Sequence, residues 1–257
     1  YVQEDPQWAA IFTLTGEQLT WSLIAYGFIA AVLPVWLLLA PRDYLSTFLK
    51  IGTIVGLAIG VIIISPQLKM PALTQFIDGT GPVWSGDLFP FLFVTIACGA
   101  ISGFHSLIAS GTTPKLLASE SHTRYIGYGG MLMESFVAIM ALVAASVIEP
   151  GVYFAMNSPA ALVGSDVQSV AAAVSSWGFT ITPGELEAVA ADIGENTILA
   201  RAGGAPTLAV GIAQILHQVL PGQNTMAFWY HFAILFEALF ILTAVDAGTR
   251  AGRFMLQ

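Results

Sequence analysis

Long, uninterrupted apolar runs dominate the chain, and few stretches alternate between apolar and polar residues. The runs that reach or approach the roughly 20 residues a helix needs to cross a bilayer cover residues 20–40, 49–65, 88–110, 129–149 and 226–247. Only helices and closed barrels satisfy every backbone polar group in lipid, and continuous runs favour helices. The pattern therefore predicts an all-α fold, a polytopic transmembrane helical bundle.

The basic residues predict how this bundle is oriented, because loops that carry Lys and Arg tend to stay in the cytoplasm. The loops between 66–87 and across 150–200 carry more acids than bases and are expected outside. The basic residues that place the other loops in the cytoplasm are Arg42 with Lys50, Lys115 with Arg124, and Arg250 with Arg253.

A sixth apolar run, 205–220, is short for a full crossing, and 168–180 is weaker still. On the predicted orientation the run 129–149 ends outside and 226–247 begins outside. The segment 205–220 must then enter and leave on one side, which predicts at least one broken or re-entrant segment. Such segments are tolerated where they line a protein cavity. The alternative is a short but complete crossing at which the charge rule fails locally.

Composition supports a membrane protein and excludes some functions. Apolar residues make up 56% of the chain and charged residues 9%, against about 25% charged in an average globular domain. The mean hydropathy is +0.78. The net charge of −8 argues against nucleic acid as a partner, which would require a basic face. We expect one membrane domain over 1–257, with 150–200 as an external acidic loop and the lipid bilayer as its surroundings.

His105 and Glu134 form one candidate for proton transfer. His105 lies five residues before the end of the run 88–110, and Glu134 lies five residues after the start of 129–149. At 1.5 Å per residue, consecutive antiparallel helices place both about 7 Å from the same membrane face. Ionisable groups within a membrane are costly and usually functional. The alternative is a hydrogen-bonded pair that serves structure only.

Glu237 is the best single candidate for a proton carrier, because it falls near the middle of the run 226–247. A charge at that depth costs roughly 2.5–3.5 kcal/mol on insertion scales, and protonation would lower this cost. Tyr230 lies seven positions earlier, on nearly the same helix face. Asp246 and Arg250 are spaced as a solvated ion pair at a helix end.

Hydroxyl residues after the run 88–110 are candidates for binding a carboxylate. Gly111 and Pro114 predict that the helix ends there. A broken helix end offers hydroxyls and free N–H groups, as in transporters with discontinuous helices. The alternative is a plain helix terminus. The candidates are Ser102, Ser110, Thr112 and Thr113.

Signals for enzymes and cofactors are absent from the sequence. There is no Walker-type phosphate loop, no HExxH and no Cys/His spacing for zinc, so no metal and no cofactor are expected. No nucleophile constellation suggests an enzyme. The GYGG at 127–130 lacks the preceding Thr-Val of a potassium filter, which argues against a selectivity filter.

Several long stretches closely resemble the carbon starvation protein A family. They include YGFIAAVLPVWLLLAPRDYLSTFLKIGTIVGLA (26–58), GFHSLIASGTTPK (103–115), IGYGGMLMESFVAIMALVAA (126–145), GVYFAMNSP (151–159), RAGGAPTLAVG (201–211) and FWYHFAILFEALFILTAVDAGTR (228–250). The similarity covers essentially the whole chain and is weakest over 160–200. Family members are considerably longer, so the chain resembles the central part of such a protein.

The resemblance implies a multi-pass transporter of the bacterial inner membrane, used when carbon is scarce. The family is described as taking up peptides, and some members as importing pyruvate with protons. It is grouped with the amino acid–polyamine–organocation superfamily of secondary transporters. The expected partners are protons and a small carboxylate-bearing substrate, pyruvate or a short peptide. The alternative function is a membrane channel or stress sensor without coupled transport.

Overall fold

The computed structural model describes residues 5–34, 36–101 and 103–256. The chain divides into two compact units. The first contains Tyr1–Thr47, Gly103–Leu116 and Ile241–Gln257, and the second contains Phe48–Ser102 and Leu117–Phe240. The candidate residue Ser102 lies outside the described residues.

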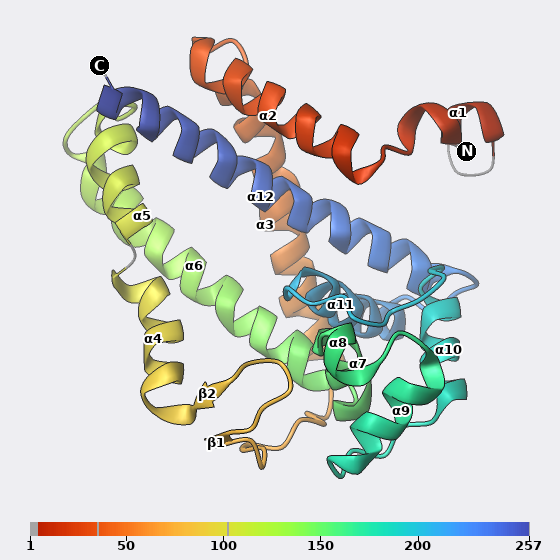
Figure 1. Cartoon of the computed structure of the whole chain (residues 1–257). Coiled ribbons are helices and arrows are strands. Elements are labelled where there is room, and N and C mark those ends of the chain that lie inside the picture. Colours follow the sequence, from red (N-terminus) through yellow and green to blue (C-terminus); the bar gives the residue numbers. More distant parts are fainter. Residues whose placement is uncertain (1–4, 35, 102, 257) are drawn as a thin grey trace. The chain divides into compact units, whose positions relative to one another are not determined.

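The described residues are predominantly helical (Figure 1). Helices α3 (Leu39–Ile64), α6 (His122–Val147) and α12 (Thr225–Leu256) are each long and apolar enough to cross a membrane. Within the described ranges, β structure is limited to the antiparallel pair β1 (Asp78–Gly79) and β2 (Gly86–Asp87). These observations confirm the predicted all-α helical membrane fold.

The run 20–40 was predicted as one helix, and this prediction is wrong. Two short helices come first, α1 (Pro6–Phe12) and α2 (Gly16–Val32). A capping box of Thr15 and Gln18 starts α2. The helix ends at Val32 because Leu33 precedes Pro34, and the residue before a proline disfavours helical backbone. The next helix, α3, already begins at Leu39, so Arg42 and Lys50 lie within a helix and not in a loop.

The run 88–110 changes its helical type before it ends. It contains α4 (Leu88–Ile101) and α5 (Gly103–Leu107), and continues as a π-helix, η1 (Ile108–Thr112), and a 3₁₀ turn, η2 (Thr113–Lys115). Pro114 has no N–H to donate, so regular α-helical bonding cannot continue through it. Single π turns often occur at functional sites.

The other long helices extend beyond their predicted ends. Helix α6 begins at His122, so GYGG at 127–130 is ordinary helix, unlike the extended backbone that a filter needs. Helix α12 continues to Leu256 and therefore includes Asp246, Arg250 and Arg253, which were expected at or after a helix end.

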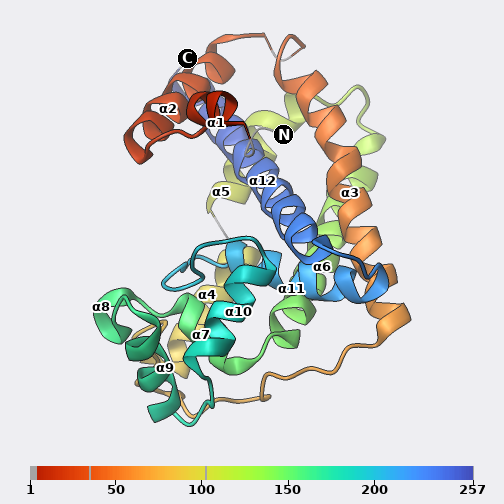
Figure 2. The same cartoon turned by 90° about the vertical axis from the view of Figure 1, so that its right-hand side faces the viewer.

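Helix α11 (Ala205–Val219) corresponds to the short run 205–220 and belongs to the second unit (Figure 2). Most of its residues are buried. It packs on α6 where Gly211 meets the backbone carbonyl of Ala144, and on α3 where Gly60 meets Ile215. Fifteen residues span about 22 Å, less than the bilayer core. Its re-entrant placement stays a prediction.

The stretch 150–200 contains helices where the sequence suggested a loop. They are α7 (Pro150–Asn157), α8 (Ala160–Val163), α9 (Val167–Ser176) and α10 (Pro183–Asp192). Their apolar side chains, among them Phe154, Val170 and Leu186, join the core of the second unit. The side of the membrane on which this stretch lies stays a prediction.

Candidate functional site

Glu237 lies half-buried on α12 in the second unit, beside the fully buried Phe236. Tyr230, which was expected on the same face, is only 1% exposed. Its hydroxyl accepts a hydrogen bond from Arg201 at 3.2 Å, and Arg201 pairs with Glu195 at 2.8 Å. Hydrogen bonding to Glu195 raises the pKa of Arg201. Tyr230 therefore ties α12 to the segment that enters α11.

His105 and Glu134 lie on α5 and α6, and both side chains are exposed within this chain. His105 belongs to the first unit and Glu134 to the second. Their pairing stays a prediction.

The candidate hydroxyls differ in their surroundings. Ser110 donates to the carbonyl of Ser106 at 2.7 Å, a bond within its own helical turn. Thr112 is buried in η1, and its hydroxyl has no hydrogen-bond partner among the described residues. Thr113 starts η2, and its carbonyl accepts from the N–H of Leu116. Thr112 therefore combines a buried hydroxyl with the capacity to hydrogen-bond a ligand.

A buried charged cluster in the first unit was missed by the sequence analysis. Asp246 is 2% exposed, and its Oδ2 atom forms an ion pair with Nη1 of Arg42. The hydroxyl of Tyr26 donates to the same oxygen at 3.1 Å and accepts from Arg42. Nη2 of Arg42 also donates to Thr243 at 2.9 Å and to Asp43 at 3.1 Å. The cluster joins α2, α3 and α12.

Arg250 does not form the solvated pair with Asp246 that the spacing suggested. Arg250 is 5% exposed and donates to the carbonyls of Ala30 and Leu33, each at 3.0 Å. Arg253 donates to the carbonyl of Ala31 at 2.6 Å. These carbonyls end α2 and have no intrahelical partners, so both arginines cap the negative end of that helix.

One signal in the sequence could have revealed the cluster. Arg42 stands between the apolar runs 20–40 and 49–65, and Asp246 stands inside the last run. Opposite charges within membrane helices usually pair with one another. The spacing of Asp246 and Arg250 on one helix instead favours a local ion pair between them.

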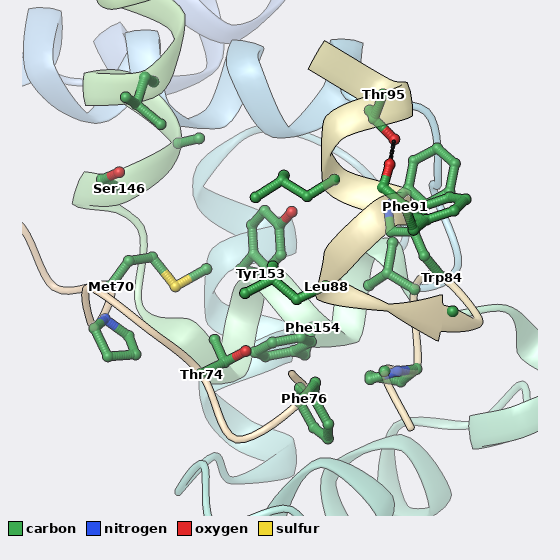
Figure 3. A pocket seen from close by; sticks show the side chains of 18 residues that line it. Met70, Thr74, Phe76, Trp84, Leu88, Phe91, Thr95, Ser146, Tyr153 and Phe154 are labelled. Atoms are coloured by element: carbon green, nitrogen blue, oxygen red, sulfur yellow. Dashed lines mark hydrogen bonds between the residues drawn. The ribbon is translucent and has the colours of Figure 1, made fainter. Parts of the chain in front are cut away.

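A pocket of about 450 Å³ lies in the second unit, near the end of α6 and the start of α7 (Figure 3). Aromatic side chains line much of it, including Phe76, Phe91, Tyr153 and Phe154. The lining contains no charged residue. Burial raises the pKa of the Tyr153 phenol, which therefore stays protonated. The pocket suits an apolar group better than a carboxylate.

A second, more polar cavity of about 430 Å³ is lined by His217, Asp192, Gln214 and Gln218. Nδ1 of His217 lies 2.5 Å from the hydroxyl of Thr225, which fixes the ring. In the part of the chain that the structure describes, no group of three or more His, Cys, Asp or Glu residues is arranged to hold a metal ion.

Comparison with known proteins gives consistent matches. The family model described as "Carbon starvation protein CstA" matches residues 1–257. The chain is 71% identical to the "Peptide transporter CstA" of Escherichia coli (strain K12), covering 100% of this chain and 37% of that protein. It is 63% identical to the "Pyruvate/proton symporter BtsT" of the same organism, with 100% and 39% covered.

A third relative, the "Peptide transporter CstA" of Campylobacter jejuni, is 65% identical and is covered over 37% of its length. The chain thus spans less than two-fifths of the length of these relatives. No solved structure matches the chain.

Proposed function

The chain belongs to the carbon starvation protein CstA family, and on that premise we propose that it forms part of a proton-coupled secondary transporter. The substrate is a small carboxylate-bearing nutrient, pyruvate or a short peptide. The protein is multi-pass and resides in a bacterial inner membrane, where it serves uptake when carbon is scarce.

The observation that carries this proposal is high identity, over the entire chain, to relatives named for two different substrates. One is named a peptide transporter and another a pyruvate/proton symporter. Both substrates carry a carboxylate, so a common carboxylate site is compatible with either name. Helices α3, α6 and α12, which are apolar and of membrane-spanning length, support a role within the bilayer.

We assign proton carriage to Glu237, with Glu134 and His105 assisting. Glu237 is supported by its place within α12 and its half-buried side chain. Acids within membrane helices commonly serve proton relays in transporters. We assign substrate contact to the segment that holds Ser102, Ser110, Thr112 and Thr113. The strongest support is the Thr112 hydroxyl, which is buried and has no hydrogen-bond partner in the part of the chain that the structure describes.

The test is uptake of labelled pyruvate into proteoliposomes that contain the full-length protein, with an imposed inward proton gradient. Accumulation that depends on the gradient and resists excess dipeptide would establish a monocarboxylate–proton symporter. Accumulation that dipeptide abolishes would assign the site to peptides. Equilibration without accumulation of either substrate would contradict the proposal and favour a channel or sensor.

A further inference from the structure

The buried cluster around Asp246 leaves several polar atoms without partners. Oδ2 of Asp246 receives both the Arg42 guanidinium and the Tyr26 hydroxyl. Oδ1 of Asp246, Nε of Arg42 and Nε of Arg250 are buried and have no hydrogen-bond partner among the described residues. Buried polar atoms in native proteins are nearly always paired, so each exception calls for an explanation.

The pair of Arg42 and Asp246 is not the closed, two-bond arrangement that arginine usually makes with a carboxylate. Arg42 contacts Asp246 through Nη1, and its Nη2 donates hydrogen bonds to Thr243 and Asp43. The guanidinium therefore keeps a free N–H at Nε, and the carboxylate keeps a free oxygen. Within the described residues, Nε of Arg42 can therefore donate to one more acceptor, and Oδ1 of Asp246 can bind a proton.

Asp246 is placed so that its charge governs the whole cluster. The ionisable groups that face it are Tyr26 from α2, Arg42 and Asp43 from α3, and Arg250 from its own helix. A proton on the free Oδ1 would neutralise Asp246 without breaking a hydrogen bond. It would also weaken the attraction that holds Arg42, which would then be free to pair with another carboxylate.

We propose that Arg42 and Asp246 form an exchange site in which a proton and the substrate carboxylate bind together. The proton binds Asp246, and the substrate carboxylate replaces Asp246 on the guanidinium of Arg42 with two hydrogen bonds. On release the proton leaves Asp246 and the original pair forms again. This proposal rests on the proposed function. It adds Asp246 to the proton carriers, of which Glu237 is the first assigned, and Arg42 to the substrate contacts assigned to the segment that holds Thr112.

The competing explanation is a structural tie, in which the ion pair only holds α2, α3 and α12 together. The two explanations differ in what happens when both charges are removed. Removal of one partner of a buried pair leaves an uncompensated charge, whereas removal of both is often tolerated. A structural tie therefore predicts that the double variant, Arg42→Gln with Asp246→Asn, regains the stability and transport that Arg42→Gln alone loses.

Two assays on the full-length protein in proteoliposomes separate these cases. One is proton-driven accumulation of labelled pyruvate or dipeptide, whichever the wild type accumulates. The other is exchange of labelled for unlabelled substrate without a gradient, which needs no net proton movement. Asp166→Asn is the matched control, because it neutralises an exposed carboxylate at a helix N-cap, where Asn caps equally well.

We expect Asp246→Asn, which mimics the protonated acid, to keep exchange and lose accumulation. The double variant should remain monodisperse and raise the substrate concentration for half-maximal exchange by roughly tenfold or more, because the guanidinium contact is gone. Asp246→Asn that accumulates substrate like the wild type, or a double variant that transports normally, would overturn the exchange site. If the wild type itself fails to accumulate any substrate, the proposed function fails instead.

Discussion

Glu237 illustrates how much a single residue in a membrane helix can indicate. It directly follows Phe236, which is fully buried and whose ring packs on Phe240 at 4.9 Å. A carboxylate so placed is costly when charged and less so when protonated. The same reasoning applies less strongly to Glu134, whose side chain is exposed within this chain.

We predict that Glu237→Gln abolishes gradient-driven uptake while the protein still inserts into the membrane, because glutamine keeps the shape of the acid but cannot carry a proton. The measurement is accumulation at several external pH values. Glu187→Gln, on the exposed face of α10, is the control. If the Glu237 variant accumulates substrate with the pH profile of the wild type, Glu237 is not a proton carrier.

Glu134→Gln tests the assisting role in the same assay. We expect uptake to lose much of its dependence on the proton gradient, while expression is unchanged. Unchanged gradient dependence would remove Glu134 from the proton path and leave it as a structural residue.

Capping residues give a prediction on pH. Thr182 and Glu185 form a capping box at the start of α10, with the Glu185 carboxylate 2.7 Å from the Thr182 N–H. Hydrogen bonds from Thr182 lower the pKa of Glu185. A lowered pKa means that the carboxylate stabilises the helix above its unfolded pKa and loses this effect as the pH falls through its folded pKa.

We therefore expect the amides at the start of α10 to lose protection from hydrogen exchange below about pH 4. Thr182→Ala should weaken the same amides at neutral pH, at a cost of about 1 kcal/mol for the lost cap. Protection in the variant equal to that in the wild type at both pH values would show that the capping box does not stabilise α10.

At the scale of elements, the sequence predicted the long helices well and their ends poorly. Apolar runs identify α3, α6 and α12 because burial in lipid requires them. The stop at Val32 depends on Pro34, and α3 already begins at Leu39, before the predicted run 20–40 ends. The Arg42–Asp246 pair joins positions more than 200 residues apart. Local spacing favours Asp246 with Arg250 instead, and the signal for the long-range pair is an opposite charge on each of two apolar helices.

Helix α11 shows how close packing fixes an element. A Cβ at Gly211 would collide with the backbone carbonyl of Ala144 on α6. We predict that Gly211→Ala destabilises the protein by about 1–3 kcal/mol, the usual cost of overpacking. Thermal unfolding of the detergent-solubilised full-length protein measures it. Gly184→Ala, which meets open space on α10, is the matched control, and an equal melting temperature for both variants would contradict this account of the contact.

At the scale of the whole molecule, the chain is a helical membrane protein of the carbon starvation protein CstA family. Large apolar side chains such as Trp36, Ile62 and Phe89 are more than 70% exposed within it. This exposure suits contact with lipid, or with segments equivalent to those parts of the relatives that the chain does not cover. Transport must therefore be tested on the full-length protein.

The central claim is that substrate and proton move together, and proton movement itself tests it most directly. Full-length protein would be reconstituted in proteoliposomes loaded with a pH-sensitive dye, with no gradient imposed. We predict that adding pyruvate or a dipeptide acidifies the lumen, and that a protonophore collapses the change. Uptake of labelled substrate with no acidification would contradict proton coupling.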